Sequence, residues 1–150
     1  MDRSTQSDAH QEAGIRDALR ELFARYAWCF DTGDVDGYVG TFASDGVLDL
    51  PDGQFAGHAQ IRAYATDVVA DPSFVGRQHF VGQSLYDPAP RRWTVRSYAM
   101  ITQAVSGASP TIVSAGYYAD ECVETKDGWR FARRTYRRWG GDVLRRFPTA

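Results

Sequence analysis

An aspartate on an apolar helical face and a histidine on an alternating strand are the residues of this sequence best suited to proton transfer. Apolar residues recur with helical spacing at Leu19, Leu22, Phe23, Tyr26, Ala27 and Phe30. This spacing predicts one face of an amphipathic helix, and Asp31 continues that face. Because a carboxylate on a buried face is costly without a partner, we expect Asp31 to pair with His79.

His79 lies in a segment, residues 77–86, whose polarity alternates as in a strand. With a period of two, its face also holds Arg77, Val81, Gln83 and Leu85. The apolar members indicate that this face points inward. A carboxylate bonded to one imidazole nitrogen fixes the tautomer and raises the basicity of the other nitrogen. Such a pair can remove a proton next to a carbonyl or give one to a leaving group.

Two other interpretations stay open at this point. An inward histidine can be a satisfied core residue, and an aspartate near a helix end can cap local backbone groups. Tyr26 lies on the same broad side of the helix as Asp31 and is a third candidate, because its hydroxyl could point into the same pocket.

The elements that would position these residues are helices followed by long strands. We expect helices at 11–32, at 35–42 and from Gly57-His58 to Asp71-Pro72. Gly33 is a good stop for the first, and Asp34 can cap the second. We expect short strands at 47–50 and 54–56, and longer strands at 77–86, 92–105, 111–125 and 129–139. Turns such as Lys126-Asp127-Gly128 separate the long strands and predict an antiparallel meander.

This order of elements is α+β. We predict a cone-shaped α+β barrel in which three N-terminal helices pack on a long, strongly curved antiparallel (mixed) sheet. Long twisted strands curl, so a pocket should form between the first helix and the concave face. The domain should span residues 12–140, with a flexible N-terminal tail at 1–11 and a C-terminal tail at 141–150.

The composition excludes several classes of function. The net charge of −2 gives no case for nucleic-acid binding. No apolar run is long enough to span a membrane, and the polar first residues lack the apolar segment of a signal peptide. Cys29 and Cys122 fit no metal or redox spacing and are expected to be reduced core residues of a cytoplasmic protein, although a disulfide between them stays open. No metal motif or phosphate loop is present, so we expect no metal and no cofactor.

Four stretches carry a resemblance to a known family. They are the eleven residues from Ala24 (Ala-Arg-Tyr-Ala-Trp-Cys-Phe-Asp-Thr-Gly-Asp), 42–47, 57–62 and 127–131. In these sequence motifs, and in the order of its predicted elements over about residues 12–139, the chain resembles the SnoaL-like group of the NTF2-like (cystatin-like) superfamily. The resemblance implies the cone-shaped fold and, in relatives, a dimer or trimer.

One branch of the superfamily is especially similar. Scytalone dehydratase, bile acid 7α-dehydratase and hexachlorocyclohexane dehydrochlorinase use an Asp at the end of the first helix and a His in the first long strand. Asp31 and His79 match these two residues, and Tyr26 matches a helix Tyr of the bile acid enzyme. The resemblance implies that His79 is the base, that Asp31 orients it and that Tyr26 donates a hydrogen bond to a carbonyl or leaving oxygen.

The chain also departs from that branch. The dehydratases carry a second Tyr on the short strand after the second helix and a further His or Asp in the strand after the catalytic His. Residues 47–50 contain no Tyr, and residues 92–105 contain neither His nor Asp, so the substrates of these enzymes are not carried over. As substrate-binding candidates we name Trp28, Leu50, Tyr98, Met100, Tyr117 and Arg134.

Arg134 could bind an anionic or carbonyl group. The alternative is that the arginines of the last strand form a solvated face and a subunit interface. A long sheet leaves a convex face and edges that need cover, so we expect a homo-oligomer, a trimer or a dimer.

We predict a cofactor-independent, dehydratase-like lyase or a cyclase. Its partner would be a small apolar organic substrate, oxygenated and polyketide-like or steroid-like, and the mechanism would be Asp–His acid/base catalysis. The alternative is a non-catalytic module that binds a small molecule or builds an oligomer, for example a partner resembling a dioxygenase β-subunit. Polyketide cyclases and ketosteroid isomerase are further members of the superfamily.

Overall fold

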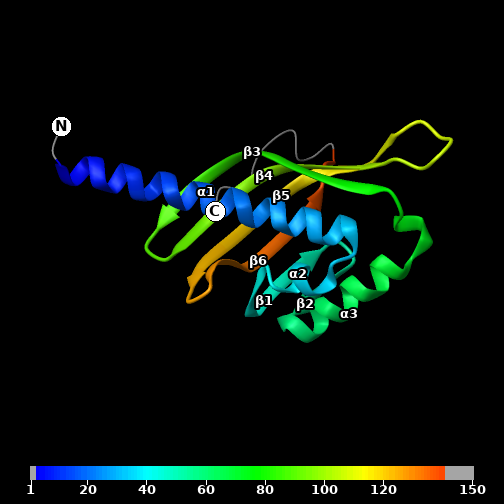
Figure 1. Ribbon diagram of the computed structural model, residues 1–150, viewed down its shortest axis with the longest axis horizontal. Helices are drawn as coiled ribbons and strands as arrows, with labels where there is room; N and C mark the ends of the chain where they lie inside the picture. Colours follow the sequence, from blue (N-terminus) through cyan, green and yellow to red (C-terminus); the bar gives the residue numbers. More distant parts are fainter. Residues whose placement is uncertain (1–2, 141–150) are drawn as a thin grey trace.

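Three helices pack on one open, six-stranded mixed sheet in the computed structural model, which describes residues 3–140 (Figure 1). The helices are α1 (Arg3–Thr32), α2 (Val35–Val39) and α3 (Gly57–Ala70), and a short 3-10 helix η1 (Pro72–Phe74) follows α3. The strands are β1 (Phe42–Leu50), β2 (Gly53–Ala56), β3 (Arg77–Ala89), β4 (Arg92–Gln103), β5 (Thr111–Thr125) and β6 (Gly128–Arg138).

The strand order is β2-β1-β6-β5-β4-β3, with β1 parallel to β6 and every other pair antiparallel. This confirms the predicted α+β architecture and the meander from β3 to β6. The sheet does not close into a barrel, because β2 and β3 remain as its edges. The predicted C-terminal tail lies outside the described residues.

The helix α1 crosses one face of the sheet and supplies much of the core (Figure 1). It ends at Thr32 as predicted, because Gly33 adopts a left-handed φ of +78° that stops a helix. It begins at Arg3 rather than Gln11, so most of the segment predicted as a tail is helical. The sequence did not predict this extension because it lacks apolar residues at helical spacing. It contains no proline, so nothing stops the helix there.

The helix α2 is shorter than predicted because the chain enters β1 early. Phe42, placed in the second helix by its apolar spacing, is the first residue of β1; it pairs with Phe131 of β6 and is buried. The register then shifts between Phe42 and Val47, so residues 44–46 are an irregular part of the strand.

Asp34 caps α2, as predicted: its Oδ1 accepts a hydrogen bond from the Gly37 amide at 2.9 Å. Replacing Asp34 with Ala should lower the free energy of unfolding by about 1 kcal/mol, because one helix N–H loses its acceptor. Chemical denaturation measures this change, and Asp34→Asn should recover most of it. A loss no larger in Asp34→Ala than in Asp34→Asn would contradict the cap.

A bulge in β3 changes which residues face inward. The register with β4 shifts between Gly82 and Leu85, and Gln83 has a left-handed φ of +45°. Arg77, His79 and Val81 share one face as predicted, but beyond the bulge the alternation is reversed. Leu85, expected to point inward, is 65% exposed, and its neighbours on either side are the partly buried residues.

Candidate active site

The last turn of α1 and the first part of β3 bring Asp31 and His79 together. Asp31 Oδ1 lies 2.5 Å from His79 Nδ1, and Asp31 Oδ2 accepts the His79 backbone amide at 2.8 Å. The His79 side chain is 5% exposed and the Asp31 side chain 15% exposed. Both carboxylate oxygens are therefore used, one to orient the ring and one to attach β3 to the helix.

This geometry leaves one imidazole nitrogen for chemistry. With Nδ1–H donating to the Asp31 carboxylate, Nε2 of His79 is the nitrogen that can take up a proton. The ring packs against Phe30 and Phe74, with ring centroids 5.4 Å and 6.4 Å away, and these two phenyl rings also contact each other at 5.4 Å. Packing against this aromatic pair restricts rotation of the imidazole and preserves its hydrogen bond to Asp31.

Asp31 and His79 lie on the wall of a pocket of about 860 Å³ between α1 and β3. Phe23, Ala27 and Trp28 line it from α1, and Arg77 and Val81 line it from β3. The pocket is bordered by an edge strand, and the Trp28 side chain, 72% exposed, is on its rim. The walls are mainly apolar, with the Asp31–His79 pair set among them.

Tyr26 lies in the core and is not part of this pocket. It is 3% exposed, and its hydroxyl accepts a hydrogen bond from Tyr38 at 3.1 Å. The pKa of the Tyr26 hydroxyl is raised well above its usual range, and burial is the main cause. The structure therefore does not bring Tyr26 to the pocket that Asp31 and His79 line.

Arg134 also lies in the core. Its guanidinium forms an ion pair with Asp120 at 3.1 Å, and both side chains are fully buried. The rings of Tyr118 and Tyr26 lie 3.6 Å and 4.1 Å from the guanidinium carbon. The arginine that we expected to receive a substrate anion is therefore enclosed by its own carboxylate and aromatic neighbours.

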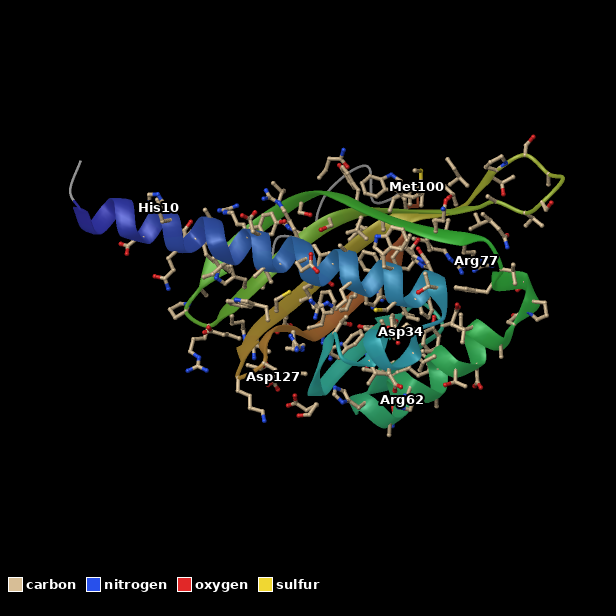
Figure 2. The ribbon with its side chains drawn as sticks, in the orientation of Figure 1. His10, Asp34, Arg62, Arg77, Met100 and Asp127 are labelled. Carbon is tan, nitrogen blue, oxygen red and sulfur yellow. The ribbon has the colours of Figure 1, made fainter. Side chains whose placement is uncertain are left out.

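The remaining substrate-binding candidates lie elsewhere. Tyr98 and Met100 are 47% and 37% exposed, whereas Ser97 and Ala99 are buried, so the two candidates are on the opposite face of β4 from the core. Figure 2 shows Met100 beyond the strands, away from α1. Tyr117 pairs with Tyr98 across the sheet and shares its face. Leu50, at the end of β1, packs against the core rather than the pocket.

Two residues near His79 were not singled out by the sequence: Arg77, which lines the pocket, and Phe74, which packs against the His79 ring. Arg77 was placed on the His79 face by strand alternation, but nothing in the sequence gave it a role. Phe74 lies in η1, where three residues carry no period that could have indicated it.

The remaining exclusions rest on residues 3–140. In this range, no three His, Cys, Asp or Glu side chains are grouped so that they could hold a metal ion. No helix in the same range is long and apolar enough to cross a membrane. Cys29 and Cys122 are free thiols, so the disulfide left open by the sequence is not formed.

A family model described as "SnoaL-like domain" matches residues 11–135. No curated protein matches the chain significantly. Among solved structures, an Asp-to-Asn variant of a Mycobacterium tuberculosis protein of unknown function is 26% identical, with a TM-score of 0.80 over 87% of this chain and 75% of that one.

Two structures from Novosphingobium aromaticivorans show the same fold. An NTF2-like protein with a cystatin-like fold is 24% identical, with a TM-score of 0.81 over 97% of this chain and 98% of that one. A protein provisionally named a scytalone dehydratase is 16% identical, with a TM-score of 0.74 over 88% of this chain and 89% of the other.

Proposed function

This chain belongs to the SnoaL-like domain family, and we propose that it is a cofactor-independent lyase or cyclase that acts on an apolar, oxygenated small molecule. The observation that carries the proposal is the 2.5 Å contact between Asp31 and His79 on the wall of an apolar pocket. A polyketide-like or steroid-like ring compound is the class of substrate that such a pocket would accept.

In the proposed reaction, Nε2 of His79 removes a proton from a carbon next to a carbonyl. The electrons of the broken C–H bond form an enolate, which then either expels a hydroxyl group as water or attacks a second carbonyl to close a ring. Asp31 is a positioning residue, because it stabilises the imidazolium that forms on His79. In elimination, the imidazolium returns its proton to the departing oxygen; in ring closure, it protonates the alkoxide formed from the second carbonyl, so His79 ends neutral in both cases.

Proton abstraction can be tested without knowledge of the natural product. We expect the protein, incubated in deuterium oxide with hydroxylated cyclic ketones, to place deuterium on the carbon next to the carbonyl. Water loss or ring closure should follow for the best compounds, and both are measured by mass spectrometry. Binding of these ketones with no deuterium uptake above the buffer rate would contradict an enzymatic role.

A specific observation favours a second candidate, a non-catalytic binding module. The side chains of Tyr26, Tyr118 and Arg134 fill the space between α1 and the sheet, which leaves the pocket to one side of the core. In a non-catalytic module, the Asp31–His79 hydrogen bonds would serve only to hold α1 and β3 together. Loss of this pair would then lower the melting temperature without changing any reaction rate.

A further inference from the structure

We propose that Arg77 binds a carboxylate group of the substrate, so that the substrate has an apolar body and one carboxylate. This inference rests on the proposed function, since it takes the pocket between α1 and β3 to be the place where the substrate binds. It adds the chemical class that this pocket selects.

Arg77 lies close to the proposed base and on the same wall. It is the first residue of β3, two positions before His79, and both residues line the pocket. Two residues along a strand span about 7 Å. A carboxylate on Arg77 would therefore lie only a few bonds from the carbon presented to His79. Figure 2 shows Arg77 at the beginning of β3, near the C-terminal end of α1.

The guanidinium of Arg77 lacks the partners that other arginines of this protein have. Arg62, Arg92 and Arg134 each contact a carboxylate within 3.1 Å. Over residues 3–140, no ion pair includes Arg77, and its buried Nε–H has no hydrogen-bond acceptor. A buried donor without an acceptor is destabilising. Arg77 is therefore a cation of the pocket wall that has no direct ion-pair partner among the described residues.

The chemistry of this cation suits a planar anion. The guanidinium carbon lies 4.1 Å from the centre of the Phe74 ring, and Phe74 also packs on His79. Phe74 thus contacts the guanidinium by a cation–π interaction, and the terminal N–H groups of Arg77 are the donors available to an acceptor in the pocket. A carboxylate matches such donors with two parallel hydrogen bonds.

The other charged side chains near Arg77 or on the pocket wall already have hydrogen-bond or ion-pair partners. Asp31 is bonded to His79, and Asp71 accepts the Ser73 backbone amide at 2.8 Å. Arg20, the other cation lining the pocket, is paired with Asp17 at 2.7 Å and lies about 17 Å from Asp31 along the helix. One available cation among apolar walls favours a monocarboxylate.

The test compares two probes of the same shape, 2-naphthoate and its neutral amide, by titration calorimetry. We expect the wild type to bind the carboxylate about tenfold to a hundredfold more tightly than the amide, as for hydrogen bonds to a charged group. Arg77→Met should abolish this preference, because it should weaken carboxylate binding far more than amide binding. Arg77→Lys should retain only part of it, because an ammonium lacks the planar fork.

The controls separate this inference from the proposed reaction. His79→Ala should keep the preference for the carboxylate, so a protein that fails to catalyse deuterium exchange can still pass this test. Arg62→Met, an exposed arginine away from the pocket, controls for the lost net charge. The assignment would be overturned by an equal preference in Arg77→Met, by a preference that disappears with Arg20→Met instead, or by inorganic phosphate competing as well as the carboxylate.

Discussion

Replacing His79 with alanine should lower kcat/KM about 10²- to 10⁴-fold while the fold survives. Loss of a general base typically lowers the rate by this factor. The hydrogen bond between Asp31 and Nδ1 leaves Nε2 of His79 for proton transfer, and the substitution removes this nitrogen. Deuterium uptake into the ketone probes should fall by the same factor, since the first step is affected. Steady-state rates and mass spectrometry measure both quantities.

The matched control is His58→Ala. His58 Nε2 contacts the Phe42 carbonyl oxygen at 3.0 Å, and this histidine is not among the residues lining the pocket. Its removal costs a hydrogen bond and should lower stability without a comparable loss of rate. If His79→Ala and His58→Ala retain equal activity, His79 is not the base and the binding-module candidate is favoured.

Asp31→Asn distinguishes orientation from simple stability. The amide can still contact Nδ1, but it cannot stabilise an imidazolium, so kcat should fall strongly while KM changes little. It also keeps an oxygen for the His79 backbone amide, so the tie between α1 and β3 can persist. A variant that loses melting temperature but no activity would identify Asp31–His79 as a structural pair.

The contact between Asp31 and His79 could be predicted because each residue belongs to its own periodic pattern of apolar residues. Helical spacing sets Asp31 on the buried face of α1, and strand alternation sets His79 on the inward face of β3. No comparable constraint chose between the faces of β4, so Tyr98 and Met100 could be proposed as pocket residues although they lie on the far face.

Irregular strands account for much of what could not be predicted. The bulge around Gln83 reverses the alternation of β3, which is why Leu85 is exposed. A second register shift between Glu121 and Cys122 decides that Asp120 lies opposite Arg134. Without that shift, counting back from the turn at 126–128 would give Arg134 a different partner.

The largest effect on stability is expected for Arg134→Met. This substitution removes the cation of a fully buried ion pair and leaves the Asp120 carboxylate buried without its partner. Breaking one side of a buried pair typically costs about 3–5 kcal/mol. We expect this loss in the free energy of unfolding at about pH 9, measured by chemical denaturation.

The loss in the free energy of unfolding should be smaller at about pH 6, because the Asp120 carboxylate can be neutralised by protonation. Burial raises the pKa of Asp120 to about 7 in the folded wild type, although Arg134 acts to lower it. Without Arg134 the folded pKa lies higher still, whereas an unfolded Asp titrates near about 3.9. A raised folded pKa gives stability that is present at low pH and lost as the pH rises through it.

The two proteins therefore differ in proton binding only above about pH 7. Below that value Asp120 is protonated in both folded forms, so the deficit of the variant is constant; above it, only the wild type has an ionised and paired carboxylate, and the deficit grows. Asp120→Leu combined with Arg134→Met removes both charges and should restore most of the stability, without this pH dependence. A deficit that is equal at about pH 6 and pH 9 would show that Arg134 stabilises the core by packing against Tyr118 and Tyr26 rather than by compensating the charge of Asp120.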